Sequence, residues 1–475
     1  MNAELMRNLW LEASPRRLLI MAGILGLLFL TAAAVAPTEE LRAVAITAET
    51  VFYVLVVLWG TRNAASSVVD EIRDRTWDLQ RLSAITPWEM VWGKLLGSTS
   101  CVWFGGLICL VPITMHALAD RGAGAAGLQL AYFLSVGLIA QSVSLWTSLV
   151  AVRRRVFQSR LGTFAFQLFG IIAAFQVFSI WSTAVPSALG MSAWLSQAIE
   201  AIDWYGMRFD AASFYLGSLA IFAAWVLAAA HQFMRQELQV SMNPLVWIGF
   251  LIFIAVYFAG FLSPAIPLSE TVSQFATQQA ALASRLFIAM VVLLSATYVS
   301  LFVMPKERVK MRWLATQFGE GRFMTFFGGL PGWAWGFAFT AIAGALAIGQ
   351  LDASGVTGGE NVNSGRLFVI AIMGELARNI GIVMFFNMLA GQRRGDFAAV
   401  LSLILLYTVL PALAGASEAG PLVMSLLSPW AEIVDGNMDR STAPTFEGLS
   451  AISMWVQAAI IWPFAVLRLM DGWRR

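Results

Sequence analysis

Residues 70–94 read DEIRDRTWDLQRLSAITPWEMVWGK and lie between two apolar segments, which start near Val44 and Leu95. Each flanking segment is long enough for a spanning helix, because about 20 apolar residues at about 1.5 Å each cross a hydrocarbon core of about 30 Å. The stretch between them is the densest patch of mixed charge in a very apolar chain. It therefore predicts two membrane-spanning helices joined by a charged segment outside the hydrocarbon.

The local pattern of this stretch predicts two helices. Less polar residues recur at spacings of three and four, which favours a surface helix over Glu71–Leu82; they are Val69, Ile72, Thr76 and Leu79. Thr86, Pro87 and Glu89 then have the spacing of a capping box, with proline at the first helical position. We therefore expect a second helix to begin at Pro87.

The whole chain has the composition of an integral membrane protein. Of its 475 residues, 59% are hydrophobic and 12% are charged, and the mean hydropathy is +0.73. Apolar segments of spanning length start near Leu18, Val44, Leu95, Leu128, Gly162, Ala211, Leu245, Leu286, Gly332, Leu367, Phe397 and Ser450. The predicted fold is an all-α integral membrane protein with about twelve transmembrane helices.

The basic residues favour one set of alternate loops. Only six of the 30 Lys and Arg residues fall in the other set, and a seventh, Arg378, lies within a span; the six are Arg42, Arg121, Arg208, Arg285, Arg366 and Arg440. By the positive-inside rule, this bias predicts that both termini are cytoplasmic.

The second half of the chain repeats the first. Span starts near residues 95, 128, 162 and 211 recur near residues 332, 367, 397 and 450, about 237 residues later. We therefore predict two parallel six-helix pseudo-repeats, residues 1–239 and 240–475. The charged loop 70–94 then corresponds to the basic segment 305–331, which lacks the Thr-Pro capping box and the Gly-Lys pair.

Two other segments predict helices that do not span. Residues Met1–Pro15 mix apolar and charged side chains, which favours an amphipathic helix lying in the inner interface before the first span. Residues Pro186–Asp203 are too short and too polar for a further span, so we expect an outer interfacial or re-entrant helix there.

Charged and polar residues within the predicted spans are candidates for a translocation path. Glu375 and Arg378 are three residues apart on the tenth span and share a face, next to Asn379. An unpaired charge near the midplane costs about 3 kcal/mol, so such groups pair or face water. The pair either clamps the bundle together or lines a path between the halves, with Gln141 at the equivalent position of the first half. Glu49, early in the second span, is a further candidate.

The sequence lacks the motifs of common catalytic sites. The only Gly-Lys pair, Gly93-Lys94, has Trp88 where a phosphate-binding loop requires glycine. The chain contains no Gly-x-Ser-x-Gly or His-Glu-x-x-His motif, and His116 and His231 are isolated in sequence. We therefore expect no catalytic residues, no metal site and no nucleotide site in this chain, and no nucleic-acid partner.

Residues 70–94 resemble the cytoplasmic loop of permeases in the type 2 family of ATP-binding-cassette (ABC) exporters. In that family, a charged helix with a Gly-Thr pair, followed by Ser/Thr-Pro and Gly-Lys, docks on the ATPase subunit; here Arg75 replaces the glycine. The resemblance implies coupling through Glu71, Arg73, Asp74, Thr76, Trp77, Asp78, Thr86, Pro87, Glu89, Gly93 and Lys94. The weaker counterpart in the second half would use Lys306, Glu307 and Arg308.

The predicted function is that of a fused permease subunit of an ABC exporter in the cell inner membrane, surrounded by membrane lipids. Two separate cytoplasmic ATPase subunits would bind ATP and Mg²⁺ and drive translocation, so the chain itself is not expected to be an enzyme. The alternative is an ion-coupled secondary transporter with two six-helix halves, which would use Glu375, Arg378 or Glu49 for ion coupling.

Overall fold

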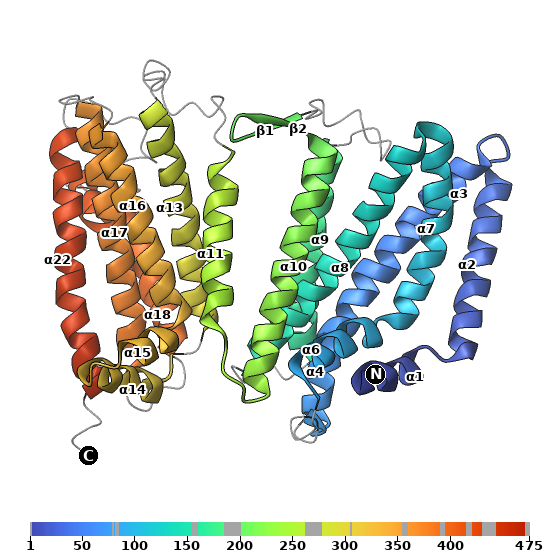
Figure 1. The fold of residues 1–475 in the computed structure, drawn as a ribbon, viewed down its shortest axis with the longest axis horizontal. Coiled ribbons are helices and arrows are strands. Elements are labelled where there is room, and N and C mark those ends of the chain that lie inside the picture. Colours follow the sequence, from blue (N-terminus) through green and yellow to red (C-terminus); the bar gives the residue numbers. More distant parts are fainter. Residues whose placement is uncertain are drawn as a thin grey trace. The chain divides into compact units, whose positions relative to one another are not determined.

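The computed structural model describes residues 2–77, 80, 85–153, 160–184, 201–261, 278–304, 306–353, 360–389, 395–414, 420–429 and 443–470 (Figure 1). Helices account for most of these residues, and the sheet among them has two strands. The chain divides into two compact units, Met1–Asn243 (unit 1) and Pro244–Arg475 (unit 2), each of which is described by itself.

Ten helices in the described part of the chain are long and apolar enough to cross a membrane, so the chain is an all-α, multi-pass membrane protein. They cover Pro15–Val35, Glu40–Arg73, Ser100–Arg121, Ala123–Ala151, Thr163–Ser182, Ala211–Glu237, Ala281–Val303, Gly332–Leu351, Gly365–Asn387 and Gly448–Met470. At the seventh and eleventh predicted spans, the structure has shorter apolar helices, Pro244–Ala259 and Gly395–Val409.

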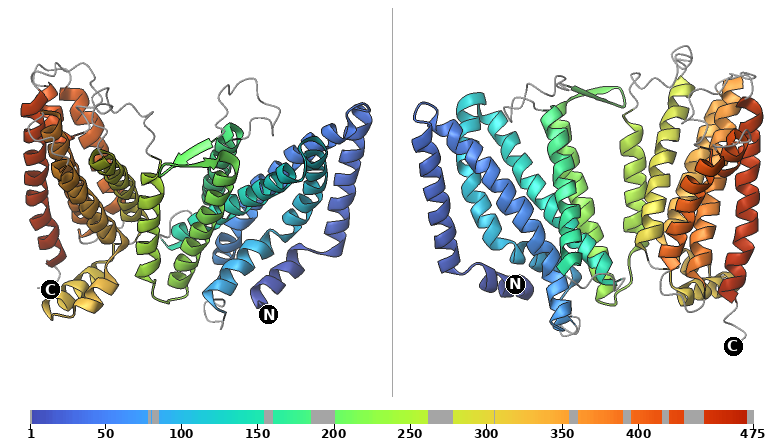
Figure 2. Two further views of the ribbon diagram at one scale, coloured as in Figure 1. Left: turned by 45° about the horizontal axis from the view of Figure 1, so that its top comes forward. Right: turned by 180° about the vertical axis from the view of Figure 1, so that it is seen from behind.

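Unit 1 begins with a short helix that is separate from the first span. This helix, α1 (Ala3–Glu12), ends before Ser14, and α2 (Pro15–Val35) starts with proline at its first position, where no N–H is needed. The remaining helices are α3 (Glu40–Phe52), η1 (Tyr53–Trp59), α4 (Gly60–Arg73), α6 (Pro87–Trp92), η2 (Gly93–Gly97), α7 (Ser100–Arg121), α8 (Ala123–Arg153), α9 (Arg160–Ala184) and α10 (Ala211–Glu237). Helix α8 is central, because it packs against α4, α7, α9 and α10 (Figure 2).

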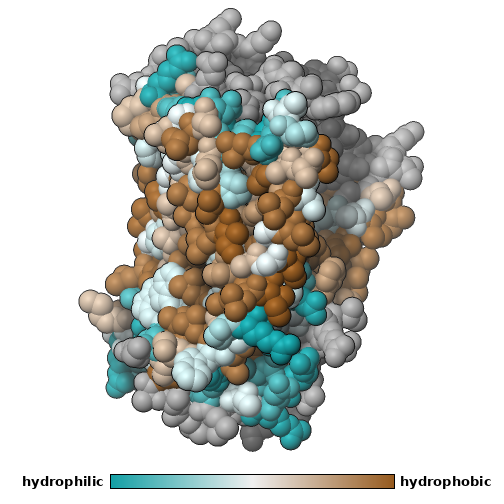
Figure 3. All heavy atoms as spheres, turned by 90° about the vertical axis from the view of Figure 1, so that its right-hand side faces the viewer, coloured by the Kyte–Doolittle hydropathy of each residue, from teal (hydrophilic) through white to brown (hydrophobic). Residues whose placement is uncertain are grey.

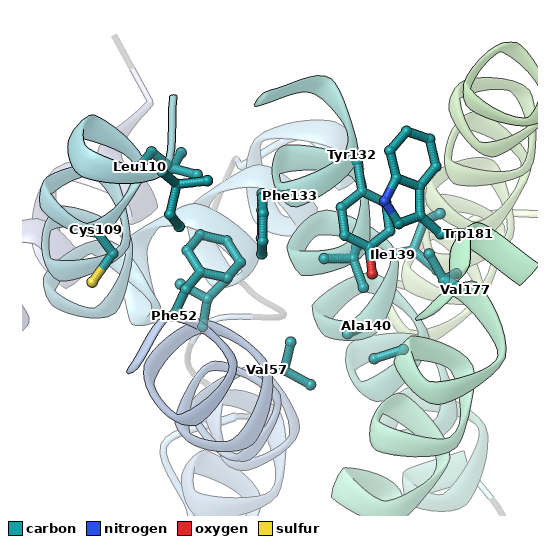
Figure 4. Close-up of a cluster of buried hydrophobic side chains, with 14 of the residues drawn as sticks. Phe52, Val57, Cys109, Leu110, Tyr132, Phe133, Ile139, Ala140, Val177 and Trp181 are labelled. Atoms are coloured by element: carbon teal, nitrogen blue, oxygen red, sulfur yellow. The ribbon is translucent and has the colours of Figure 1, made fainter. Parts of the chain in front are cut away.

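The core of unit 1 is built from aromatic side chains on α3, α8 and α9 (Figure 4). Tyr132 stacks on Trp181 with ring centroids 4.6 Å apart, and Phe52 meets Phe133 edge-on at 5.0 Å. Such pairs add about 0.5–1.5 kcal/mol each beyond the burial of their area. The Tyr132 hydroxyl, buried among them, has the Tyr53 hydroxyl as its partner at 2.6 Å.

The second span of unit 1 changes from α-helix to π-helix over Tyr53–Trp59. A π-helical turn shifts the backbone hydrogen bonds, and a carbonyl freed in hydrocarbon must find another donor. The Gln141 amide, on α8, donates to the Val56 carbonyl at 3.0 Å and accepts from the Trp103 indole at 2.8 Å. Gly60 lies directly against Gln141, so a side chain at Gly60 would displace this amide.

The sheet of unit 1 is a hairpin that leads into α10. Strands β1 (Ala201–Trp204) and β2 (Met207–Asp210) pair antiparallel, and the turn residues Tyr205 and Gly206 both have positive φ, which is typical of a type I′ turn. Asp210 then caps α10 by accepting from the Ser213 N–H at 2.9 Å. The helix predicted over Pro186–Asp203 is thus wrong at its last three residues, which are strand; residues 186–200 lie outside the described part.

Unit 2 contains α11 (Pro244–Ala259), α13 (Gln278–Val303), α14 (Arg308–Gly319), α15 (Phe323–Gly329), α16 (Gly332–Ala353), α17 (Glu360–Asn387), α18 (Gly395–Ile404), η4 (Leu405–Val409), α19 (Leu410–Ala414), α20 (Gly420–Leu427) and α22 (Ala443–Met470). Helix α17 packs against α16, α18 and α22, and α13 packs against α11 and α16. The short helices α14 and α15 lie at the end of this unit where α22 ends (Figure 1).

Helices α17 and α22 are joined by two equivalent contacts, seven residues apart on each helix. The Trp455 indole donates to the Ile370 carbonyl and the Trp462 indole donates to the Ala377 carbonyl, each at 3.0 Å. Glycines of α17 lie beneath these tryptophans: a Cβ at Gly374 would lie 2.8 Å from the Cβ of Met454, next to Trp455. Small residues thus allow close packing, as is usual between membrane helices.

The surface of unit 1 that carries α2 has an apolar band across its middle and hydrophilic side chains toward both ends (Figure 3). Leu19, Leu27 and Leu30 contribute to this exposed surface, each more than 60% accessible. An exposed band of this kind would aggregate in water, whereas it matches the hydrocarbon of a bilayer.

Candidate functional site

The charged segment after the second span starts with a sharp turn. Helix α4 ends at Arg73, and Arg75 has a φ of 60°, in the left-handed region that favours glycine. The Thr76 N–H donates to the Glu71 carbonyl at 2.9 Å and the Arg75 N–H to the Ile72 carbonyl at 3.2 Å, which is a Schellman motif. The continuous surface helix predicted over Glu71–Leu82 is therefore wrong: the turn at Asp74–Arg75 interrupts it.

Lys94 lies at the centre of a buried charge network below this turn. Its ammonium donates to the carboxylates of Glu71 and Glu4, the latter at 3.3 Å, and to the Ser67 carbonyl at 3.4 Å. The side chains of Lys94 and Glu4 are 1% and 2% exposed. Trp77 covers the ammonium, 5.2 Å from its ring centroid. A buried ion pair contributes to stability only when its remaining hydrogen bonds are made, as they are here.

The N-terminal helix α1 completes the network. Arg7 pairs with Glu4 at 2.9 Å and also contacts Glu71, and the Asn8 amide donates to Glu4 at 3.1 Å. Gly93 and Gly97, four residues apart on η2, let α1 approach closely: a Cβ at Gly97 would lie 2.6 Å from the Cβ of Asn8. We refer to Glu4, Arg7, Glu71 and Lys94 as the Lys94 network; it ties α1 to α4 and η2.

The predicted second helix begins at Pro87, and its capping box is present. The Thr86 hydroxyl accepts from the Glu89 N–H at 3.3 Å, and the Glu89 carboxylate accepts from the Thr86 N–H at 3.0 Å. This backbone hydrogen bond, followed by that from the Thr86 hydroxyl, lowers the pKa of Glu89. Trp88 stacks on His231 of α10 with ring centroids 4.4 Å apart, so α6 is fixed to a spanning helix.

The predicted coupling residues of unit 1 fall into two groups. Arg73, Asp74, Thr76 and Thr86 are exposed, whereas Trp77, Gly93 and Lys94 are buried and Glu71 takes part in the Lys94 network. Trp77 and Lys94 are covered by other residues of unit 1. Pro87 and Glu89 hold the start of α6. Asp78 lies outside the described residues.

In the segment of unit 2 that is predicted to correspond to residues 70–94, the side chain of the first lysine is also buried. The Lys306 side chain is 1% exposed and pairs with Asp396 at 2.6 Å, and Asp396 also accepts from the Asn387 amide at 3.0 Å. Arg308 donates to the Arg468 carbonyl at 2.7 Å, at the C-terminal end of α22, where a cation complements the helix dipole. Glu307 is exposed at the N-cap position of α14.

The three polar residues predicted on the tenth span form one buried cluster in unit 2. Arg378 and Glu375 are 3.8 Å apart, and the Tyr407 hydroxyl donates to Glu375 at 2.5 Å. Arg378 donates to the same hydroxyl at 2.6 Å and to Asn379 at 3.1 Å. The Asn379 amide donates to the Tyr298 hydroxyl at 2.7 Å. Tyrosines of α13 and η4 therefore surround the ion pair.

Arg378 also donates hydrogen bonds to residues of α20 and α22. These bonds reach the Leu427 carbonyl at 2.8 Å and the Gln457 amide oxygen at 3.0 Å. The cluster so joins α17 to α13, η4, α20 and α22, all within unit 2. This geometry favours the clamp interpretation of Glu375 and Arg378, because the guanidinium is surrounded by acceptors of its own unit.

Glu49 and Gln141 belong to separate contacts of unit 1. Glu49 accepts from the Gln129 amide at 2.9 Å, and the amide oxygen of Gln129 accepts from Arg121 at 2.9 Å. The Gln141 amide instead donates a hydrogen bond to the carbonyl of Val56 in η1. The structure therefore gives each of these two candidates a local partner of its own.

Sequence reasoning missed the residues that α1 and the tyrosines contribute. Glu4 and Asn8 are four residues apart, and Gly93 and Gly97 repeat this spacing, a small-residue pattern that indicates close helix packing. Tyr298 and Tyr407 carry no such signal, because single tyrosines are common in apolar helices.

Comparisons of the chain with protein-family models, with curated proteins and with solved structures find no match. A function for this protein is therefore inferred from the turn after α4, the Lys94 network and the buried cluster around Arg378.

Proposed function

We propose that the chain is the permease subunit of an ATP-driven transporter, with twelve spans in two six-span halves and a separate ATPase at the turn after α4. The observation that carries this proposal is an exposed charged turn, Arg73–Thr76, at the end of a spanning helix that the Lys94 network holds in place. A partner that moves this turn would move the second span with it.

Equivalent neighbours in the two units support the repeat. In unit 1, α8 packs against α7, α9 and α10; in unit 2, α17 packs against α16, α18 and α22. Helix α2 meets α3 and α7, as α11 meets α13 and α16. Two glycines four residues apart lie near the predicted start of the third span of each half, Gly93 with Gly97 in η2 and Gly332 with Gly336 in α16. All four pack closely against neighbouring residues.

The rigidity of the turn supports a coupling role. A force is passed on only by a segment that does not yield, and the turn is fixed by the Schellman hydrogen bonds above and by the buried ion pairs below. The next helix, α6, is fixed by its capping box and by the stacking of Trp88 on His231. In this proposal the turn faces the cytoplasm, where two ATPase chains bind ATP and Mg²⁺, and the membrane is the inner membrane.

The test is purification of the tagged chain in mild detergent with ATPases encoded by neighbouring genes. We expect an ATPase to co-purify with the wild-type chain and to be lost from Asp74→Ala and Arg73→Ala, because both side chains are exposed on the turn. The matched control is Arg42→Ala, an exposed arginine at the opposite end of the same helix, α3–α4.

Two results would contradict the proposal. One is a chain that binds no neighbouring ATPase. The other is equal ATPase loss from Arg42→Ala and Asp74→Ala, since a general loss of folding would then explain both. The eluted chain is therefore also compared by gel filtration.

The alternative function is an ion-coupled secondary transporter, for which the buried carboxylate of Glu375 is the candidate ion site. A carboxylate within a spanning helix is a common ion site, and Glu375 lies beside Arg378 and two tyrosines. This function predicts transport in ATP-free proteoliposomes that an ion gradient drives and Glu375→Gln abolishes. Transport that needs ATP and survives Glu375→Gln would exclude it.

A further inference from the structure

An apolar groove of about 450 Å³ lies between α16, α17 and α22 of unit 2. Ala377 and Ile380 of α17 contribute to its lining, together with Trp333, Trp455, Trp462 and Ala459 of the two neighbouring helices. Its volume falls within the range of about 300–1,000 Å³ that is usual for small-molecule sites. Because all three helices are long enough to span, the groove lies where lipid chains are the abundant apolar solute.

Two of the three tryptophans that line the groove are held in place. The indoles of Trp455 and Trp462 donate to the carbonyls of Ile370 and Ala377, which restrains their rings. Trp455 remains 43% exposed in spite of this bond. A preformed apolar surface binds a chain without first having to order its own side chains.

Basic residues lie at the end of the groove where α16 begins and α22 ends. The guanidiniums of Arg308 and Arg312 contact the carbonyls of Arg468 and Leu469 at 2.7 and 2.8 Å. Trp462 is six residues from Arg468, about 9 Å along the helix. The Gly332 N–H donates to the Met304 sulfur at 3.2 Å, so the start of α16 lies beside the segment that leads into α14.

Two buried donors at this end have no acceptor among the described residues, the Trp333 indole Nε1 and the Arg308 Nε. Both atoms are shielded from solvent, so a ligand would contact the accessible remainder of these side chains. Arg308 is half-buried, and a guanidinium recognises phosphate. Helices α14 and α15 also carry exposed apolar residues, among them Met324, which is 91% exposed. These residues would lie at the membrane–water interface, at the level of the lipid headgroups.

We propose that this groove binds an anionic phospholipid, with one acyl chain against the three tryptophans and the phosphate against Arg308 and the other cations of α14. The positive charge of α14 makes the site prefer anionic over zwitterionic lipids. The tryptophan rings form the surface against which the acyl chain packs. This site is independent of whether an ATPase drives the protein.

The test uses the purified full-length chain and phospholipids that carry a photoactivatable diazirine on one acyl chain, with a phosphoglycerol or a phosphocholine headgroup. Labelled peptides are mapped by mass spectrometry. We expect the anionic probe to label the peptides that contain Trp333 and Trp455–Trp462, and unlabelled anionic lipid to compete better than phosphatidylcholine.

Two variants separate the chain site from the headgroup site. Ala459→Phe, at an exposed position in the groove, abolishes labelling there, whereas Ile460→Phe, exposed on the next position of α22, leaves labelling unchanged. Arg308→Gln lowers the preference for the anionic probe about fivefold, the effect of one cation near a membrane surface. Arg42→Gln, in unit 1, leaves the preference unchanged.

The proposal is overturned if the groove peptides are unlabelled in a wild-type chain that labels elsewhere, because another part of the protein would then cover the groove. It is also overturned if both headgroups label equally, or if Ala459→Phe and Ile460→Phe behave alike. Each variant is checked by gel filtration, so that misfolded protein is excluded.

Discussion

Replacing Lys94 with methionine tests the Lys94 network most directly. The substitution keeps the length and the apolar stem of the side chain and removes the charge. Glu4, at 2% exposed, then keeps its carboxylate in a buried site with one cation fewer, while Glu71 loses the same partner. Removing one partner from a buried ion pair costs about 3–5 kcal/mol.

The expected cost lies at the lower end of this range, because Arg7 still contacts both carboxylates. For a unit of the size of unit 1, about 1 kcal/mol corresponds to about 2–4 °C in Tm. A cost of about 3 kcal/mol therefore predicts a fall of about 6–12 °C. The assay is thermal unfolding in a fixed detergent, followed by intrinsic fluorescence and by loss of the monodisperse peak.

The second half of the experiment is the double variant Glu4→Gln/Lys94→Met. Glutamine keeps the shape of Glu4 and can still accept from Asn8, but it needs no buried cation. We expect the double variant to be more stable than Lys94→Met alone, since the uncompensated carboxylate is gone. Lys310→Met, an exposed lysine, is the control for loss of a lysine.

The reasoning is refuted if Lys94→Met unfolds at the same temperature as Lys310→Met. It is equally refuted if Glu4→Gln lowers the Tm of the Lys94→Met protein further, because the two side chains would then act independently.

Three other substitutions give measurable outcomes. Arg75→Gly relieves a left-handed conformation and raises unfolding free energy by about 1 kcal/mol in the same thermal assay, whereas Asp74→Gly does not. Because the pKa of Glu89 is lowered from 4.5, its charge stabilises α6 fully above that value and loses this effect as pH falls through the lowered pKa; hydrogen exchange of α6 in the wild type and in Glu89→Gln should therefore converge in acid. Tyr407→Phe removes the hydroxyl between Glu375 and Arg378 and lowers the unfolding free energy by about 1–3 kcal/mol in the same thermal assay.

The spanning helices and the capping box could be predicted from the sequence because they follow from local patterns. A run of about 20 apolar residues has few alternatives to a spanning helix. Likewise, Thr86 and Glu89 are close in sequence, and their contact needs no knowledge of the rest of the fold. The proximity of Glu375 and Arg378 could also be predicted from a local pattern, because residues three apart lie on the same face of a helix.

The partners of Lys94 could not be predicted in this way. Glu4 is 90 residues away, and a charged residue in a polar loop is as consistent with exposure as with burial. The left-handed conformation of Arg75 was also not predicted, although the resembled family has glycine at this position, because an arginine side chain does not by itself signal a positive φ. The Lys94 contacts depend on how α1 packs on η2, which is a tertiary feature, whereas the conformation of Arg75 depends on where α4 ends.

The paired indole contacts of α17 and α22 have a mechanical consequence. Trp455 and Trp462 lie over Gly374 and Gly381 while donating to carbonyls seven residues apart, so sliding one helix by a turn would place bulkier residues beneath both rings and break both hydrogen bonds. A ratchet-like shift between these two helices is therefore blocked at two points at once. In the proposed transport cycle, α17 and α22 should therefore move together as one rigid body.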